Sequence, residues 1–190
     1  MILSFDTETT GLINYKAPLT HSSQPRIVQL GAMLFDDEEH LLGEINLLIK
    51  PAGWTIPAEA QAVHHISTEM CEKYGVPINV ALGMFNTYIK LGGLIVAHNL
   101  DYDYRMISGE VARLGKEPIL DAPAKFCTMK ASTDIAKIPN GRGGFKWPKL
   151  QEVYRLFFGE DFADAHNAAA DVKACARVFF ELRRKGHAPV

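Results

Sequence analysis

Four acidic residues and one histidine occupy local settings that could together form one chemical site. They are Asp6 and Glu8 in SFDTETTGL, Asp103 in AHNLDYD, and His166 with Asp171 in HNAAAD. The carboxylates are spread over most of the chain, each at the end of an apolar run or on an apolar stripe, so folding could bring them together. A cluster of carboxylates is unfavourable unless cations neutralise it, and hard oxygen ligands suit Mg²⁺ or Mn²⁺. The pattern therefore predicts a metal-dependent phosphoryl-transfer site.

The first motif places two carboxylates side by side. Asp6 and Glu8 are two residues apart in a predicted strand, so their side chains share one face while Thr7 points away. A D-x-E pair alone is usually a pair of solvated acids. Here the preceding run, residues 2–5, is uncharged, and the acids lie where a buried strand reaches the surface.

The other two motifs lie at predicted helix starts. Asp101 and Asp103 both follow the apolar strand 94–97, and either could cap the next helix, since negative charge is favoured there. Position alone assigns Asp101 to the cap and Asp103 to the metal site. Asp171 lies on a partly apolar stripe of the last helix, where a carboxylate is costly without a partner. His166 precedes or opens that helix, and alone it would be an ordinary surface histidine.

Hydrophobic periodicity predicts the elements that must position these residues. Strands are expected at 2–5, 26–35, 41–50, 94–97 and 125–129, helices at 57–62, 67–73, 79–91, 101–114, 148–158 and 167–185, and long loops at 14–25 and 136–149. Strands in a meander, followed by strands that alternate with helices, predict an α/β fold with a mixed sheet. No linker divides the chain, so one domain is expected over residues 1–190.

Composition narrows the class of protein. The 190 residues are 47% hydrophobic and 22% charged, and the net charge of −2 provides no overall basic field. This argues against a protein that coats long nucleic acid, but it allows one that grips a strand end. No apolar run is long enough to span a membrane and no secretory signal is visible, so a cytoplasmic protein is expected.

Together these motifs resemble the DnaQ-like, or DEDDh, family of 3′→5′ exonucleases, which includes the epsilon subunit of DNA polymerase III. The family pattern H-N-x-x-[FY]-D falls on His98, Asn99, Tyr102 and Asp103, which favours Asp103 over Asp101. The pattern H-x-x-x-x-D falls on His166 and Asp171, and its histidine marks the DEDDh branch. The resemblance extends over nearly the whole chain.

The resemblance implies a ribonuclease H-like fold, with a mixed five-stranded sheet flanked by helices. It implies hydrolysis that releases nucleoside monophosphates from single-stranded or frayed DNA 3′ ends, assisted by two divalent cations, Mg²⁺ or Mn²⁺. Asp6, Glu8 and Asp171 would hold the tighter ion and Asp6 the second, with Asp103 completing the cluster. His166 would be the general base; because it must be neutral, activity should rise from acidic toward mildly alkaline pH.

The resemblance also places residues against the terminal nucleotide: Thr7, Thr10, Gly11, Leu12 and His64. His64 matches the histidine of a V-H-G-[IL] motif whose glycine is replaced by His65. Asn99 could donate an amide hydrogen bond to a neighbouring carboxylate or to the chain itself, and it is also expected among the substrate-binding residues. The loop at 136–149 is basic and aromatic, through Lys137, Arg142, Phe145, Lys146, Trp147 and Lys149, and is equally compatible with a strand contact and with a solvated loop.

Several alternatives remain open from the sequence. An exoribonuclease that trims RNA 3′ ends would carry the same motifs, because no residue that reads a 2′-hydroxyl is evident. A binding module without activity would be expected to lack one of the five residues. A glycoside hydrolase needs only two carboxyl groups and no metal. The chain's protein partner could be a polymerase or a second copy of the same chain.

Overall fold

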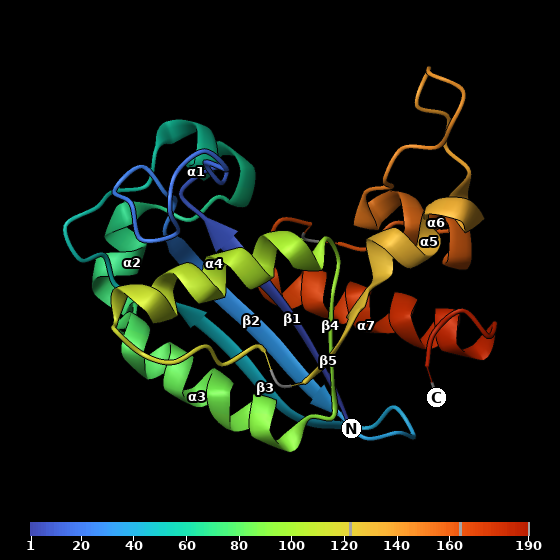
Figure 1. Ribbon diagram of the computed structural model, residues 1–190, viewed down its shortest axis with the longest axis horizontal. Coiled ribbons are helices and arrows are strands. Elements are labelled where there is room, and N and C mark those ends of the chain that lie inside the picture. Colours follow the sequence, from blue (N-terminus) through green and yellow to red (C-terminus); the bar gives the residue numbers. More distant parts are fainter. Residues whose placement is uncertain (122, 164, 190) are drawn as a thin grey trace.

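The computed structural model describes residues 1–121, 123–163 and 165–189. This part of the chain contains one mixed sheet with the strand order β3-β2-β1-β4-β5 (Figure 1). β1 is antiparallel to β2, β2 is antiparallel to β3, and β1, β4 and β5 are parallel. The strands are β1 Ile2–Thr9, β2 Ile27–Phe35, β3 Leu41–Leu48, β4 Leu94–Ala97 and β5 Ala124–Cys127. The predicted mixed five-stranded sheet is confirmed.

Helices cover both faces of this sheet. α3 and α4 share one hydrophobic core with β1 to β4, and α7 packs on the other face against β1, β2 and β4. α5 and α6 pack on the outer side of α7 in a smaller cluster. The helices are α1 Ala58–His64, α2 Thr68–Tyr74, α3 Ile78–Leu91, α4 Leu100–Arg113, α5 Thr128–Ala136, α6 Leu150–Phe158 and α7 Ala168–Arg184.

Alternation along β1 determines which side chain meets which layer. Leu3 and Phe5 belong to the core beneath α3 and α4, where the Phe5 and Phe85 rings are 5.1 Å apart. Ser4 points the other way, and its hydroxyl donates to the Val172 carbonyl of α7 at 3.2 Å. This small side chain lets α7 approach the strand closely. The same alternation directs Asp6 and Glu8 toward α7.

β1 continues past its apolar run, residues 2–5, and includes Asp6 and Glu8 as predicted. β2 pairs Asp6 with Gly31 and Glu8 with Gln29, so the acids lie within the strand. β4, by contrast, pairs with β1 only at Ile2 to Ser4. The second half of β1 therefore has an open edge on the side where β4 has ended.

Two expectations about the helices were wrong. α5 occupies residues that were predicted as the end of a strand or left unassigned, because Ser, Thr and Asp are weak helix formers. Buried Met129 and Ser132 hold it in place by packing, and the Ser132 hydroxyl bonds back to the Thr128 carbonyl at 2.7 Å. Asp101 is not the cap of α4 either: Asn99 occupies that position, and Asp101 pairs with Arg105 at 3.4 Å.

The remaining predicted elements are confirmed to within a few residues at their ends. Ser67 caps α2 and accepts a hydrogen bond from the Met70 amide at 3.2 Å. Within the ranges that the structure describes, no helix combines the length and apolar character needed to cross a bilayer.

Gly31 controls how closely the start of α7 approaches the sheet. A Cβ at this position would lie 2.8 Å from the backbone carbonyl of Ala168. We expect Gly31→Ala to lower the free energy of unfolding by about 1–3 kcal/mol through overpacking, measured by thermal or urea denaturation. The control is Gly83→Ala in α3, where a Cβ meets nothing within 4 Å and the better helix former should stabilise by about 0.5–1 kcal/mol. Equal effects of the two substitutions would contradict this account of the contact.

Candidate active site

The site lies where the second half of β1 faces the beginning of α7. Asp6 and Glu8 are both half-buried and point to the α7 side of the sheet. Asp171, in the first turn of α7, is also half-buried. Carboxylate oxygens of Glu8 and Asp171 and a ring nitrogen of His166 all lie within 4.8 Å of one another. This spacing could place all three around one metal ion.

Asp103 reaches the same region through the open edge of β1. Its side chain is 2% exposed, and one carboxylate oxygen accepts two hydrogen bonds from Thr7, from the amide at 3.1 Å and from the hydroxyl at 2.7 Å. The amide is free to donate because β4 no longer pairs with β1 at this point. Thr7 thus fixes the Asp103 carboxylate beside Asp6.

His166 lies in the turn before α7 and is exposed. Its φ of 68° is in the left-handed region, which is unfavourable for a residue with a Cβ. Two bonds hold the turn: the His166 amide donates to the Asp171 carboxylate at 3.1 Å, and the Asn167 side chain caps α7 by accepting from Ala169 at 3.1 Å. The proposed base and the carboxylate are therefore fixed relative to each other.

Gln29 supports this turn and was missed in the sequence. Its side-chain oxygen accepts from the Ala168 amide at 3.1 Å, and its nitrogen donates to Asn46 at 2.8 Å. The start of α7 is thereby attached to β2. The sequence contained a signal for this role, because Gln29 is a polar residue within the otherwise apolar strand IVQLGAMLF. A buried polar side chain needs a hydrogen-bonding partner.

Burial raises the pKa of all four carboxylates, and repulsion by neighbouring acids adds to the effect for Asp6, Glu8 and Asp103. Burial raises the pKa of Glu8 to about 7, and the charge of Asp171 adds to the effect. Burial likewise raises the pKa of Asp103 to about 7 against the opposing Thr7 bonds, and that of Asp171 to about 6. The pKa of Asp6 is raised well above its usual value by burial and then by Asp103, Asp171 and Glu8.

No lysine or arginine of the described residues forms an ion pair with any of these four acids. Glu110 offers a comparison within the same molecule, because it is as buried as Asp103, at 2% exposed. It is paired with Arg26 at 2.7 Å and with Arg113 at 3.4 Å. The fold thus neutralises a structural buried acid with side chains, whereas the acids of the site have no such partner.

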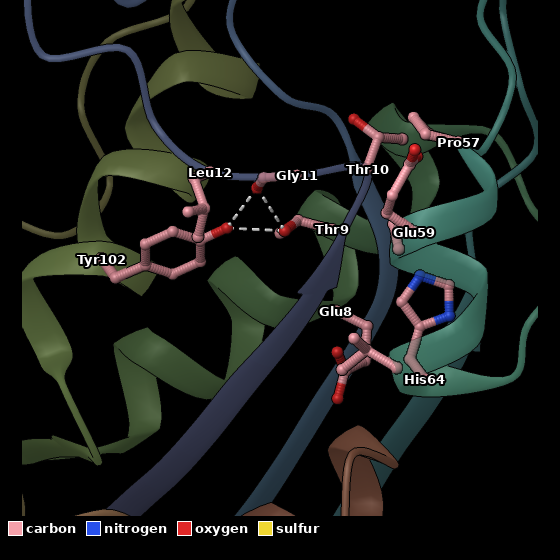
Figure 2. A pocket seen from close by; sticks show the side chains of 11 residues that line it. Glu8, Thr9, Thr10, Gly11, Leu12, Pro57, Glu59, His64 and Tyr102 are labelled. Carbon is pink, nitrogen blue, oxygen red and sulfur yellow. Dashed lines mark hydrogen bonds between the residues drawn. The ribbon is translucent and has the colours of Figure 1, made fainter.

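A cavity of about 490 Å³ opens beside Glu8, between the end of β1 and α1 (Figure 2). Tyr102 closes one side: its hydroxyl donates to the Gly11 carbonyl at 2.7 Å and lies 2.6 Å from the Thr9 hydroxyl. Leu12, next to this anchored turn, is 87% exposed. The remaining lining residues are Thr10, Pro57, Glu59, Ala60, Val63 and His64.

His64 presents an unused hydrogen-bond donor in the cavity wall. The side chain is 5% exposed, and its Nδ1 accepts from the Ile66 amide at 3.1 Å. Burial lowers the pKa of His64, so the neutral ring carries its proton on Nε2. Among the described residues, that nitrogen has no hydrogen-bonding partner.

His65 explains why a glycine is usual at its position. It ends α1 in the left-handed conformation, with φ of 60°, which glycine adopts without strain. The histidine keeps this backbone geometry at a cost of about 1–2 kcal/mol. His65 thus adopts the backbone conformation that a glycine would favour at this position.

Of the other residues predicted to contact the terminal nucleotide, some line the cavity and some do not. Gly11 and Leu12 line the cavity, as does Thr10, whose hydroxyl accepts from the Arg26 amide at 2.8 Å. Thr7 is buried, lies outside the cavity lining and bonds to Asp103 instead. Asn99 is exposed, and its side chain forms no hydrogen bond within the described ranges.

His98 is a partly buried histidine whose two ring nitrogens both have hydrogen-bonding partners. Its Nδ1 lies 2.9 Å from the Thr128 hydroxyl and its Nε2 lies 3.0 Å from the Pro148 carbonyl. Burial lowers its pKa to about 4, so the ring is neutral at physiological pH. His98 thus joins the end of β4 to the segment before α6.

Known structures share this fold. A structure of exonuclease I superimposes with a TM-score of 0.77 at 19% identity, over 96% of this chain and 40% of that one. Escherichia coli exonuclease I in complex with a dT13 oligonucleotide gives a TM-score of 0.75 at 18% identity, covering 97% and 42%. The chain thus spans about two fifths of the length of these proteins, and shares with them a ribonuclease H-like fold.

Sequence comparison identifies the family. The chain is 28% identical over 189 residues to a DNA polymerase III subunit epsilon of Treponema pallidum, covering 97% of this chain and 79% of that protein. It is also 28% identical over 189 residues to the uncharacterized exonuclease CP81 of Escherichia phage 186, covering 96% and 88%. The family model RNase_T, described as Exonuclease, matches residues 3–179. The chain therefore belongs to the RNase_T exonuclease family.

Proposed function

We propose that this nuclease is a DEDDh-type 3′→5′ exonuclease that releases nucleoside monophosphates from single-stranded or frayed DNA ends with the help of two divalent cations. One observation carries the proposal. Four partly or fully buried carboxylates lie together, without a lysine or arginine partner among the described residues, beside a cavity of nucleotide size.

The residues fit a divalent metal. The donors are carboxylate oxygens, which suit Mg²⁺ and Mn²⁺. Their raised pKa values support a role for a bound positive charge, which would favour the ionised form of all four. Asp6, Glu8, Asp103 and Asp171 would hold the ions. When bound, such ions polarise the scissile phosphate and stabilise the attacking and leaving oxygens.

His166 is proposed as the general base for the attacking water. Its ring is exposed to solvent, yet the turn that carries it is fixed by its amide bond to Asp171. A neutral ring nitrogen within 4.8 Å of the Glu8 and Asp171 oxygens can accept a proton beside the metal-binding groups. The imidazolium formed would be stabilised by the same carboxylates.

The cavity supports binding of the terminal nucleotide. His64 lines the wall of the cavity, and the exposed Leu12 side chain can contact a base. Tyr102 holds the Gly11 turn that presents Leu12. These contacts read no base-specific pattern, as expected for an enzyme that degrades strands of any sequence.

DNA is the favoured substrate because of the proteins that this chain resembles. The Treponema relative is named as a polymerase subunit, and exonuclease I has been observed with dT13. A polymerase partner is part of the same proposal. No described residue is assigned to a 2′-hydroxyl, so RNA 3′ ends remain the second substrate class to be compared.

The direct test is degradation of 5′-labelled single-stranded DNA, single-stranded RNA and mismatched duplex DNA with Mg²⁺ or Mn²⁺. We expect a ladder that shortens from the 3′ end, fastest on single-stranded DNA, and abolished by EDTA. Endonucleolytic fragments, or cleavage that persists in EDTA, would refute the proposed reaction. Faster cleavage of RNA than of DNA would indicate that the protein is an exoribonuclease instead.

Substitution of His166 separates a base from a metal ligand. We expect His166→Ala to lower kcat by about 10²- to 10⁴-fold, the usual contribution of a general base, with metal affinity changed far less. Metal affinity is measured by calorimetry and kcat at saturating metal. His187→Ala, an exposed histidine beyond the far end of α7, is the control. Parallel losses of kcat and metal affinity would make His166 a ligand instead.

Removal of one carboxylate should stabilise the metal-free protein. Because the folded-state pKa values of Glu8 and Asp171 are raised to about 7 and about 6, the native state binds more protons than the unfolded state. Stability without metal should therefore fall as pH rises from about 4 through about 7. We expect Asp6→Asn to raise Tm at pH 8 in EDTA, by about 2–4 °C for each kcal/mol of carboxylate repulsion that the substitution removes. The same substitution should abolish cleavage.

Asp134→Asn, an exposed acid on α5, is the matched control for this substitution and should leave both Tm and its pH dependence as in the parent protein. Differential scanning calorimetry between pH 5 and pH 8 gives both quantities. A lower Tm of Asp6→Asn at pH 8 would show that the carboxylates do not destabilise the metal-free fold.

A further inference from the structure

A basic hairpin connects α5 to α6. It comprises Lys137–Lys149, with the sequence KIPNGRGGFKWPK, which contains four cationic residues and no acidic one. Figure 1 shows it projecting beyond the body of the protein, at the end of the sheet toward which β1 runs from the labelled N-terminus. In a chain of net charge −2, this is a locally strong positive charge.

The basic hairpin has a defined backbone structure. Two hydrogen bonds join its arms, from the Asn140 amide to the Gly144 carbonyl and from the Lys146 amide to the Ile138 carbonyl, both at 2.9 Å. The Asn140 side chain accepts from the Arg142 amide at 2.8 Å. Gly141 and Gly143 take φ values of 73° and 85°, which glycine adopts readily. The tip is thus a built turn that presents its side chains in fixed directions.

Its base is attached to the segment that follows β4. The Pro148 carbonyl lies 3.0 Å from Nε2 of His98, which follows β4 and lies shortly before the helix carrying Asp103. His98 is partly buried, and its Nδ1 lies 2.9 Å from the Thr128 hydroxyl. The base of the basic hairpin is therefore held against the segment that leads to Asp103.

The chemistry of the basic hairpin matches a single strand of nucleic acid. Within the described ranges, Lys137, Arg142 and Lys149 form no ion pair, while Lys146 is paired with Glu152 at 2.7 Å. Phe145 is 43% exposed and Trp147 is 64% exposed. Large aromatic side chains interleaved with unpaired cations provide stacking surfaces for bases and charges for phosphates. A merely solvated loop has no need of an exposed Trp.

We propose that the basic hairpin binds the single strand on the 5′ side of the reacting end, with Trp147 and Phe145 stacking on bases and Lys137 and Arg142 contacting phosphates. This inference rests on the proposed function, because it places a second strand contact outside the cavity of the terminal nucleotide. Its consequence is that affinity depends on strand length, since only a strand that extends beyond the cavity reaches the basic hairpin.

The test compares kcat and KM for a dinucleotide and for a 16-nucleotide oligo-dT, with Mg²⁺. We expect Trp147→Ala to raise KM for the 16-mer by about 5-fold or more, with kcat unchanged, and to leave both constants unchanged for the dinucleotide. Trp147→Phe should restore most of the loss, because it keeps a stacking surface. The double variant Lys137→Ala with Arg142→Ala should also raise KM for the 16-mer and lower its salt slope by about 0.7 per lost phosphate contact.

The matched control is Lys90→Ala with Lys116→Ala, which removes the same charge from exposed positions away from the basic hairpin and should change neither slope nor KM. Binding of a fluorescein-labelled 16-mer in EDTA, followed by anisotropy, tests the same variants without cleavage. Weaker binding by the hairpin variants would support the strand contact even if no substrate were cleaved, in which case only the proposed function would fail.

Three results would overturn the inference. Unchanged 16-mer KM and anisotropy in the hairpin variants would show that the strand does not touch the basic hairpin. Equal losses for the dinucleotide and the 16-mer would show that the substitutions act on the active site through His98. An equal rise in KM for the double variant Lys90→Ala with Lys116→Ala would show that the effect depends only on the net charge of the protein.

Discussion

Repulsion among four carboxylates is the constraint to which the rest of the site responds. Asp6, Glu8, Asp103 and Asp171 come from three separate elements, and burial raises the pKa of each. Groups that repel one another stay together only if the scaffold holds them more strongly than they push apart. The fold supplies that strength through neutral contacts: Thr7 holds Asp103, the turn before α7 holds Asp171, and Gln29 ties that turn to the sheet.

The unequal lengths of two neighbouring strands make this arrangement available. β4 leaves β1 after Ser4, which frees the Thr7 amide for Asp103 on one side. On the other side, Ser4 and Gly31 are small enough for α7 to lie against the strands, and a Cβ on Gly31 would strike Ala168. The same open end leaves room for the cavity beside Glu8 and for the basic hairpin anchored at His98. Sheet register, close packing and the chemistry of the site therefore follow from one local feature.

Much of this could be predicted from the sequence, for reasons visible in particular residues. The apolar runs predicted all five strands, and the i, i+2 spacing of Asp6 and Glu8 put them on one face. What could not be predicted depends on tertiary contacts. α5 forms from weak helix formers because packing of Met129 and Ser132 stabilises it. Thr7 and Gln29 hold the site through partners far away in the sequence, which no local pattern reveals.

Proton release on metal binding tests the central claim most directly. At about pH 6.5 the metal-free site holds protons on carboxylates whose pKa values lie near 6 and 7, and a divalent cation must displace them. Titration calorimetry with Mn²⁺ in buffers of different ionisation enthalpy counts those protons. The account predicts two ions per chain, with net proton release at pH 6.5 that disappears at pH 8.5. Absence of binding, or binding without proton release at pH 6.5, would contradict a metal site built from these carboxylates.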